Sequence, residues 1–452
     1  MQRRPERAGR PKNRPNHPHR QTKLGPVIKN GPTPPQAASQ APAYAFPDAW
    51  TPWVDETIPQ FVKSRYSPKE NWKDKPFDKP DVRFFLKGVQ ELSELFTQER
   101  PRDLPAYFRH PKFRSAYLLY FMPLQAAKFI LLFQQHAKAV EAALKYAKKT
   151  GVLRIADLGA GPGTASFALL LILMKSWKEA PSTIPDIELL WVDTNPQALE
   201  DGRLLFDKFC ETNPELKGRV KLRTEVAPWW KAPKLLDGDA SLILLGNVLN
   251  EASDPTSHLR KDVRKARRDL GPDMEFETET HEPPTATIPP EWKDLLKVAK
   301  GGGILVVDPA ARGSSQRLSR IRDLLLPELK PENPRETLIW GPCLHLGACP
   351  LAQGRDWCHF SVPMKVPGKW FREFSIGLGS ERHWVKFSYL WIAAREYPAP
   401  AADRILRRVI SDPLDNSKQD ILICEPGTPR KFRSARNRDL RRGDVIRLPS
   451  KS

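Results

Sequence analysis

The segment Val152-Leu-Arg-Ile-Ala-Asp157-Leu-Gly159-Ala-Gly161-Pro-Gly163-Thr164 decides the fold. It joins a short apolar run, 153–158, to an apolar stretch with helical spacing, 164–177. Glycines let a backbone approach a ligand closely, and the N-terminus of a helix presents free N–H groups. The segment therefore predicts a strand, a glycine loop and a helix arranged around a nucleotide-like ligand.

The glycine spacing argues against a dinucleotide. The pattern is Asp157-x-Gly159-x-Gly161-x-Gly163, whereas a Gly-x-Gly-x-x-Gly fingerprint would place its third glycine on Thr164. A second apolar run then ends in an acid, Asp193, which suits the two hydroxyls of a ribose. The alternative is a glycine-rich turn that has lost its ligand.

Strand-like and helix-like segments alternate beyond Gly151 and predict an α/β fold with a parallel sheet covered on both faces. The expected strands are 153–158, 187–192, 220–226, 242–246 and 304–307, and the expected helices are 164–177, 196–210, 253–270 and 315–325. Two further runs, 374–378 and 384–393, are expected to form an antiparallel hairpin that turns at Gly379-Ser380.

The composition divides the chain into five parts. Ten prolines and few apolar side chains predict a disordered basic arm at the N-terminus. Helical spacing up to Gly151 predicts an N-terminal helical domain, and short strands near the C-terminus predict a small basic β-barrel-like domain. The expected boundaries are 1–47 for the arm, 48–80 for a surface linker, 81–150 for the helical domain, 151–395 for the core with a cysteine loop at 341–360, and 396–452 for the C-terminal β domain.

The charge predicts a polyanionic partner. The 452 residues hold 73 Lys and Arg against 53 Asp and Glu, a formal charge of +20. Residues 1–47 carry +8 of it (nine basic, one acidic) and residues 404–452 carry +7 (thirteen basic, six acidic). Nucleic acid is the simplest such partner, and a basic but otherwise ordinary enzyme is the alternative. A charged fraction of 28% and a mean hydropathy of −0.52 exclude an integral membrane protein.

Four cysteines predict a metal centre. Cys343, Cys349 and Cys358 fall in a Pro- and Gly-containing segment, and Cys424 supplies a fourth thiol from the C-terminal domain. Four thiolates suit zinc or an iron–sulfur cluster, and the spacing Cys-x5-Cys-x8-Cys fits a cluster better than paired zinc knuckles. His345 and His359 are substitute ligands, three unliganded buried cysteines are the alternative, and Cys210 is expected in the core of the protein.

The glycine loop and the acid that follows it resemble those of class I S-adenosylmethionine-dependent methyltransferases. That resemblance implies Gly159, Gly161 and Gly163 as the methionine-binding loop, Asp157 beneath it, and Asp193 on the ribose of S-adenosylmethionine. In Leu244-Leu-Gly246-Asn247-Val-Leu-Asn250-Glu251, the polar side chains could contact the cofactor or cap the next helix, and we include Asn247 in the cofactor site. The Asn/Asp-Pro-Pro-aromatic motif of base methylases is not there, so no catalytic residue is assigned.

The cysteine segment resembles one family in particular. Cys343-x-His345-x3-Cys349-Pro-Leu is followed by Asp-Trp-Cys358-His-Phe-Ser, and both come after a glycine-rich core. This is similar to the methyltransferase-like assembly factors of the small ribosomal subunit, which have mitochondrial and bacterial members. The resemblance implies a 4Fe-4S cluster on Cys343, Cys349, Cys358 and Cys424 and binding to small-subunit ribosomal RNA and ribosomal proteins. Leu344 stands where the family usually has Pro.

These features predict a monomeric assembly factor of the small ribosomal subunit that binds S-adenosylmethionine and a structural 4Fe-4S cluster, with little or no methyltransferase activity. One alternative is an active S-adenosylmethionine-dependent rRNA methyltransferase, and another is a zinc-stabilised RNA-binding protein with a relict cofactor pocket. The Pro-rich arm cannot form the amphipathic helix of a mitochondrial presequence, so we expect the bacterial cytoplasm, with the mitochondrial matrix as the alternative.

Overall fold

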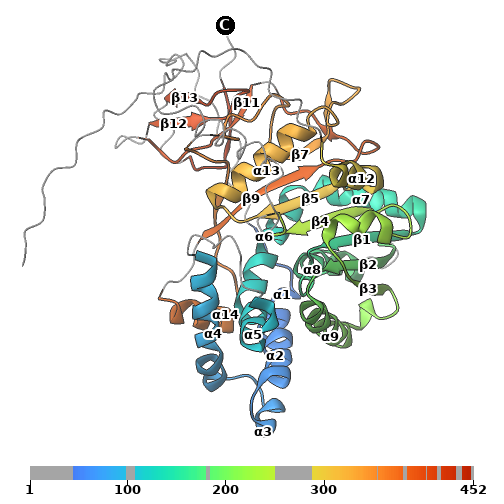
Figure 1. Ribbon diagram of the computed structural model, residues 1–452, viewed down its shortest axis with the longest axis vertical. Coiled ribbons are helices and arrows are strands. Elements are labelled where there is room, and N and C mark those ends of the chain that lie inside the picture. The colour runs from blue at the N-terminus through green and yellow to red at the C-terminus, as the bar shows by residue number, and fades with distance from the viewer. Residues whose placement is uncertain are drawn as a thin grey trace, which may run out of the picture.

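The computed structural model describes residues 44–97, 107–179, 184–249, 288–353, 355–379, 384–403, 405–414, 419–433 and 440–448. Almost all of the expected basic arm and the helix expected at 253–270 lie outside these residues. Figure 1 shows three parts: helices around α4, a large sheet beside them, and short C-terminal strands on top.

A mixed sheet forms the centre of the molecule. Its order is β3-β2-β1-β4-β5-β9-β7, and β8 pairs with β9 off this path. The first five strands in that order are parallel, and β9 is antiparallel to its partners β5, β7 and β8. The strands are β1 Val152–Leu158, β2 Asp186–Asp193, β3 Val220–Val226, β4 Leu242–Gly246, β5 Ile304–Asp308, β7 Ile339–Gly341, β8 Phe360–Pro363 and β9 Trp384–Ile392.

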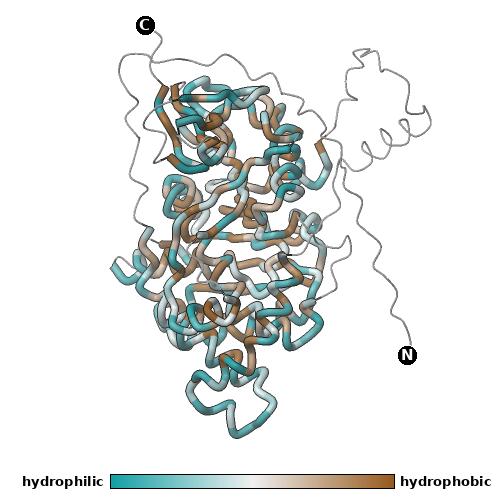
Figure 2. Tube along the Cα trace, turned by 90° about the vertical axis from the view of Figure 1, so that its left-hand side faces the viewer, coloured by the Kyte–Doolittle hydropathy of each residue, from teal (hydrophilic) through white to brown (hydrophobic). Residues whose placement is uncertain are grey.

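Each face of the sheet buries its own set of side chains, because neighbouring residues of a strand point to opposite faces. Leu153, Ile155 and Trp191 belong to the larger core cluster, with helices α6, α7, α8 and α9. Ala156 and Val192 belong to the other, with α12 and α13. Figure 2 shows the hydrophobic segments inside and the hydrophilic ones outside. The helices are α6 Met122–Gln135, α7 Ala137–Thr150, α8 Thr164–Glu179, α9 Pro196–Thr212, α10 Ala232–Leu235, α12 Pro290–Val298 and α13 Arg312–Leu325.

The residues expected as a surface linker, 48–80, are largely helical and partly buried. Trp50 and Trp53 are 0% and 1% exposed, and the Trp53 ring lies 5.5 Å from Phe167 of α8. The linker interpretation was wrong in this respect, because these indoles complete the core under α8. The helices before α6 are α1 Trp50–Pro52, the π-helix η1 Trp53–Thr57, α2 Ile58–Tyr66, α3 Glu70–Lys73, α4 Lys79–Thr97, the 3-10 turn η2 Tyr107–Arg109, α5 Pro111–Ala116 and the π-helix η3 Tyr117–Phe121.

One continuous helical stretch, Pro111–Gln135, is long and apolar enough to cross a membrane by length and composition. Of its most apolar window, 89% is buried inside the protein. Packing against α8 and the sheet therefore accounts for its apolar composition. Gly151 ends the next helix, α7, as expected, in the left-handed conformation with φ +82°.

The hairpin expected over 374–393 was wrong in its first half. Residues Lys369–Gly377 form helix α14, and only Trp384–Ile392 is a strand, β9. Trp370, Phe371 and Phe374 share one face of α14 and are all buried. This spacing is helical, and it outweighs the local run of apolar residues that indicated a strand.

The C-terminal strands form a small unit with its own apolar cluster of Val409, Ile421, Ile423, Phe432 and Ile446. β11 pairs with β14 and β12 with β13, all antiparallel, and a bridge between Val409 and Ile423 links the two pairs. The described strands thus form two linked ribbons, and closure into a barrel stays a prediction. The strands are β11 Leu406–Arg408, β12 Asp420–Ile423, β13 Arg430–Arg433 and β14 Val445–Arg447, and a further short pair joins β6 Glu336–Thr337 to β10 Ala399–Pro400.

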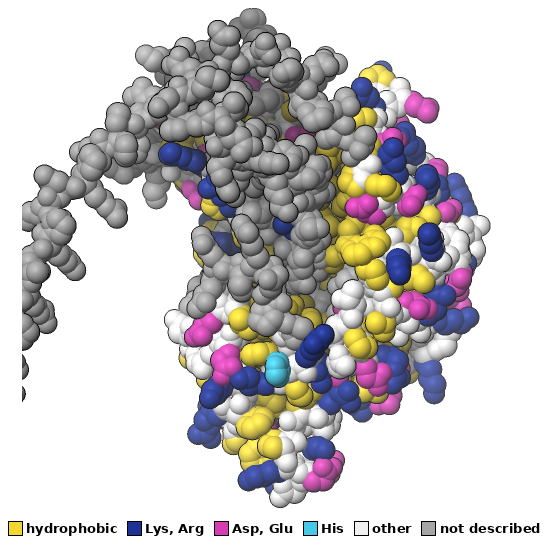
Figure 3. Space-filling model, in the orientation of Figure 1, with side chains coloured by type: hydrophobic (Ala, Val, Ile, Leu, Met, Phe, Trp, Pro, Cys, Tyr) yellow, Lys and Arg dark blue, Asp and Glu magenta, His cyan; other side chains and the backbone are white. Residues whose placement is uncertain are grey.

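Charges of both signs are mixed over the face seen in Figure 3. Lys and Arg side chains alternate there with Asp and Glu across the described surface. This agrees with the charge count, because residues 48–403 carry +5 of the total (+20 less +8 and +7).

Candidate functional site

A cavity of about 850 Å³ opens at the carboxyl ends of the parallel strands. Asp157 and the glycine loop follow β1, Asp193 ends β2, and Asn247 follows β4, so three neighbouring strands deliver residues to one edge. A volume of this size falls within the range of roughly 300–1,000 Å³ that small-molecule sites occupy. An inner floor of loop residues and an outer wall of mostly aromatic side chains line it.

Two features require glycine in this loop: a backbone conformation with positive φ at all three glycines, and close packing at two of them. Gly159, Gly161 and Gly163 all have positive φ, at 66°, 52° and 80°. A Cβ at Gly159 would meet Val248 at 2.3 Å, and one at Gly163 would meet Trp191 at 2.2 Å, so both positions are also closed by packing. A Cβ at Gly161 would find its nearest neighbour, Phe108, only at 3.9 Å, because this glycine faces the cavity.

Asp157 lies beneath the loop and holds the start of α8. Its Oδ2 accepts hydrogen bonds from the Ser166 backbone N–H at 3.0 Å and from the Ser166 hydroxyl at 2.8 Å. Trp191 Nε1 donates to the same hydroxyl at 2.8 Å. Burial raises the pKa of Asp157 to about 7, against the opposing effect of the Ser166 hydrogen bonds.

Asp193 closes the loop from the neighbouring strand. Its Oδ2 accepts from the Gly161 N–H and its Oδ1 from the Asn195 N–H, both at 2.8 Å. Burial raises the pKa of Asp193 above its ordinary value, while these backbone donors oppose the rise. Asn195 in turn caps α9 by accepting from the Ala198 N–H at 2.9 Å. The carboxylate therefore fixes both the loop and the beginning of α9.

Three polar atoms of the lining are buried without a hydrogen-bond partner in the described structure. They are Thr164 Oγ1, Trp229 Nε1 and Asn247 Oδ1. Asn247 also has a φ of +60°, a backbone conformation that asparagine tolerates better than most residues. Buried polar atoms of this kind normally find a partner, so the three fit a ligand that supplies a donor to Asn247, an acceptor to Trp229 and either a donor or an acceptor to the Thr164 hydroxyl.

The six residues expected at the cofactor site come together around the loop. Asp157, Gly159, Gly161, Asp193 and Asn247 line the cavity, whereas Gly163 lies behind the loop against Trp191. Asn250 and Glu251 lie outside the described residues. The aromatic wall of the cavity was not predicted from the sequence. The sequence feature that could have indicated it is the density of aromatic residues at 107–121. The wall consists of Phe96, Tyr107, Phe108, Tyr117, Phe121, Trp229, Trp230 and Trp384.

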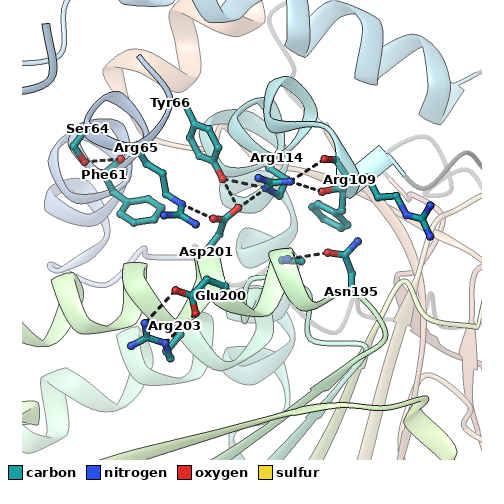
Figure 4. Close-up of polar contacts among 12 residues, drawn as sticks. Phe61, Ser64, Arg65, Tyr66, Arg109, Arg114, Asn195, Glu200, Asp201 and Arg203 are labelled. Carbon is teal, nitrogen blue, oxygen red and sulfur yellow. Dashed lines mark hydrogen bonds and ion pairs between the residues drawn. The ribbon is translucent and has the colours of Figure 1, made fainter. Parts of the chain in front are cut away.

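A buried carboxylate fastens this wall to the core (Figure 4). Asp201 of α9 is 1% exposed and accepts hydrogen bonds from Arg65 Nε at 2.6 Å, Arg114 Nε at 2.7 Å and the Tyr66 hydroxyl. Arg114 Nη1 donates to the Phe108 carbonyl at 2.8 Å. Because Phe108 lines the cavity, the ion pair positions part of the wall. Burial and the Asp201 charge raise the pKa of Tyr66 well above its usual value.

The four candidate metal ligands interact electrostatically with one another, although Cys343 and Cys424 are 81 residues apart in sequence (424 − 343). Burial is the largest cause that raises the pKa of Cys349 to about 11 and that of Cys358 to about 12, and the neighbouring thiols add to the rise in both. The same causes raise the pKa of Cys424 further. His345 Nε2 lies 3.3 Å from Cys424 Sγ.

Two buried arginines surround these thiols with positive charge. Arg322 interacts electrostatically with Cys343 and Cys349, and its guanidinium donates to the His345 and Gly347 carbonyls at 2.5 Å each. Arg408 donates to the Pro342 carbonyl at 2.7 Å and to the Gly443 carbonyl at 2.6 Å. The loop and the C-terminal strands are therefore bonded together through Arg408.

Within the described ranges, no group of three or more His, Cys, Asp and Glu side chains has an arrangement that could hold a metal ion. His359, a substitute ligand in the sequence reasoning, stacks on Trp357 with ring centroids 5.2 Å apart. Cys210 is partly buried on α9 and packs against the larger core, and burial raises the pKa of its thiol to about 11.

The strand order and the cavity define the class. Five parallel strands in the order β3-β2-β1-β4-β5, followed by antiparallel β9, with a glycine loop after β1 and an acid after β2, make a class I methyltransferase-like fold. Residues 288–426 match the protein family described as mitochondrial small ribosomal subunit Rsm22. This match supports the family resemblance found in the sequence.

Solved structures give weaker likenesses. The plantazolicin methyltransferase BpumL, in complex with a monoazolic desmethylPZN analog and SAH, is 9% identical, with 70% of this chain and 98% of that chain covered and a TM-score of 0.29. A class I S-adenosylmethionine-dependent methyltransferase described as putative, from Listeria monocytogenes, is 9% identical over 70% and 89%, with a TM-score of 0.27. No curated protein matches significantly in sequence. The fold assignment rests on the strand order and not on these scores.

Proposed function

We propose that the protein is an assembly factor of the small ribosomal subunit that binds S-adenosylmethionine and acts mainly as a binding protein. The observation that carries the cofactor assignment is the glycine loop held by Asp193 at the floor of an 850 Å³ cavity. The family matched by residues 288–426 is named for the mitochondrial small ribosomal subunit, which supports the ribosomal partner.

The residues present fit this cofactor. Asp193 would hold the ribose hydroxyls, Gly159 and Gly161 would receive the methionine part, and Asn247 would meet a donor with its unpartnered Oδ1. Gly163 shapes the loop and Asp157 holds it from below. When bound, S-adenosylmethionine supplies an activated methyl group.

The occupied carboxylates favour binding over catalysis. Asp157 and Asp193 are the two carboxylates among the described lining residues: Asp157 is 1% exposed beneath the loop, and Asp193 is the one assigned to the ribose, so neither is left for a base. A general base must reach the proton that it removes. The alternative, an active rRNA methyltransferase, predicts label transfer from methyl-labelled S-adenosylmethionine to small-subunit particles, with loss of that transfer in Asp193→Ala.

We further propose that Cys343, Cys349, Cys358 and Cys424 hold a 4Fe-4S cluster with a structural role. The chemistry of the donor set supports this, because the four thiols interact electrostatically with one another and with Arg322 or Arg408, whose charge suits an anionic thiolate centre; the described side chains themselves do not form a metal-holding arrangement. A bound cluster supplies a cross-link between the cysteine loop and the C-terminal strands. Zinc is the alternative metal.

Anaerobic purification distinguishes the two metals. A 4Fe-4S protein is brown, contains iron and inorganic sulfide, and bleaches in air, whereas a zinc protein is colourless. Cys424→Ser should lose most of the iron and part of its RNA affinity. Full iron content and full affinity in this variant would contradict the cross-link.

We propose small-subunit ribosomal RNA and ribosomal proteins as partners of a monomer, contacted through the basic terminal regions 1–47 and 404–452. Of the two expected locations, the name of the matched family favours the mitochondrial matrix. The bacterial cytoplasm stays a prediction from the Pro-rich N-terminal sequence alone.

Calorimetric titration with S-adenosylhomocysteine tests the cofactor site. Asp193→Asn should weaken binding about 10- to 100-fold, because a hydrogen bond to a charged group contributes about 1.5–3 kcal/mol. The matched control is Asp186→Asn, at the opposite end of the same strand with its carboxylate 62% exposed, and it should bind like wild type. Equal affinity in wild type and Asp193→Asn would refute the assignment.

A further inference from the structure

A second, smaller cavity adjoins the first. Its volume is about 240 Å³, and it shares Trp384 and Lys386, both near the start of β9, with the lining of the large cavity. Figure 1 shows β9 beginning between the helices around α4 and the C-terminal strands. The other lining residues of the small cavity are Ser361, Asp412, Arg441 and Arg442.

The junction of the cavities carries cations beside an aromatic ring. Arg441 lies over the Trp384 ring with its guanidinium carbon 5.2 Å from the centroid, and the Trp384 side chain is 44% exposed. Asp444 is the carboxylate closest in effect to Arg441: it accepts a hydrogen bond from the Arg441 backbone N–H at 2.7 Å and interacts electrostatically with the Arg441 side chain. Arg442 donates to the Trp357 carbonyl at 3.3 Å. Asp412 is the acid among the lining residues of the small cavity, and Asp356 and Asp444 interact electrostatically with Arg442 and Arg441 respectively.

Trp384 also belongs to the aromatic wall of the large cavity, as does Trp230. Trp230 is 52% exposed there and contacts Trp229 edge to face, with centroids 5.9 Å apart. Trp230 and Trp384 thus both line the large cavity with partly exposed indoles, whose faces can stack on a flat ligand. Cations next to exposed rings are the combination that binds single-stranded nucleic acids, through phosphates and base stacking respectively.

We propose that Trp384, Lys386, Arg441 and Arg442 form a platform for single-stranded RNA, from which one base enters the outer half of the large cavity beside Trp230. This inference rests on the proposed function, because it takes RNA as the partner and adds where on the protein the RNA chain binds. A duplex would not use the platform, because its bases are already stacked and paired. The net charge of +20 favours a polyanion over an acidic peptide of few charges.

The test measures fluorescence anisotropy of the full-length protein with a fluorescein-labelled 12-nucleotide single-stranded RNA and with the blunt duplex of the same sequence. Trp384→Ala should weaken single-strand binding between about 5-fold and 100-fold, the range found for the loss of one stacked base. Trp384→Phe should restore most of the affinity. Arg441→Ala should lower the slope of log affinity against log salt by about 1.

Phe84→Ala is the matched control, because Phe84 is also a large exposed aromatic residue, 46% exposed, but belongs to α4 and does not line either cavity. It should bind both RNAs like wild type. Melting temperatures of all variants separate lost binding from lost folding. A 5-bromouridine RNA should in addition form a photo-cross-link within a peptide that contains Trp384 or Trp230.

The outcomes separate this inference from the proposed function. If wild type binds neither RNA, the proposed RNA partner is wrong, and the proposal of an RNA platform is refuted as well. If wild type binds RNA but Trp384→Ala and Arg441→Ala bind like wild type, the platform is wrong and RNA binding elsewhere stands. An equal loss for single strand and duplex would likewise overturn the single-strand assignment.

Discussion

Arg114 on α5 and Asp201 on α9 form an ion pair, with 2.7 Å between Nε and Oδ2, that joins the helices before the sheet to the core. Both side chains are largely buried, at 11% and 2% exposure. Through its second contact, to the Phe108 carbonyl, Arg114 extends this link to the aromatic wall of the cavity. The stability of the wall is therefore coupled to one carboxylate.

Replacing Asp201 by Asn should destabilise the protein by about 3 kcal/mol, because it leaves two guanidinium groups without their buried counter-charge. Urea unfolding at neutral pH measures this change. The neighbouring substitution Glu200→Gln breaks only an exposed pair with Arg203 and should cost less than about 1 kcal/mol. Similar losses in the two variants would show that Asp201 does not hold the wall.

Alanine substitutions in the glycine loop should have unequal effects. Both Gly161 and Gly163 have positive φ, which costs an alanine about 1–2 kcal/mol. At Gly163 the added Cβ also overlaps the buried Trp191 ring, which adds about 1–3 kcal/mol. In thermal unfolding, the melting temperature of Gly163→Ala should therefore be lower than that of Gly161→Ala. The reverse order would contradict the packing of Gly163 against Trp191.

The stability of the protein should fall as the pH rises through the range in which Asp157 titrates. Burial raises its pKa in the folded state to about 7 from an ordinary 3.8, so the folded state binds more protons between these values. The free energy of unfolding then decreases by up to about 1.4 kcal/mol per pH unit across this window and is level above it.

Asp157→Asn should flatten that dependence while keeping an acceptor for Ser166, and urea unfolding at pH 5, 6, 7 and 8 checks it. Asp186→Asn, exposed on the neighbouring strand, should retain the wild-type slope. An unchanged slope in Asp157→Asn would mean that another group causes the pH dependence.

Arg408→Met should loosen the C-terminal strands selectively. Arg408 is 8% exposed, and its guanidinium bonds the Pro342 and Gly443 carbonyls, so losing it costs about 2 kcal/mol or more. Hydrogen exchange should rise in 405–448 and stay unchanged in β1 and β2. Arg447→Ala, which removes an exposed pair with Asp403, is the control and should leave exchange near wild type.

The sequence predicted the parallel strands and the glycine loop well, because both are encoded locally. Apolar runs of strand length and an Asp-x-Gly-x-Gly-x-Gly turn need no knowledge of distant contacts. The aromatic wall could not be predicted in this way, because Phe108 and Trp384 are 276 residues apart (384 − 108) and meet only in the folded chain. Helix α14 was mistaken for a strand for a different reason: the expected strand began at Phe374 and left out Trp370 and Phe371, whose spacing with Phe374 is helical.

The pairing of β9 has a consequence for the cysteine segment. Gly341 at the end of β7 lies opposite Trp391, and Phe360 at the start of β8 lies opposite Phe387, so both ends of 342–359 are anchored on one strand. Their partners are four residues apart, about 13 Å along a strand. The loop is thus already closed at its base by main-chain hydrogen bonds, and it needs no thiol to bring its ends together. Of the four cysteines, Cys424 alone belongs to a separate part of the chain. The cross-link that a bound metal adds here would therefore anchor the C-terminal strands to the cysteine loop.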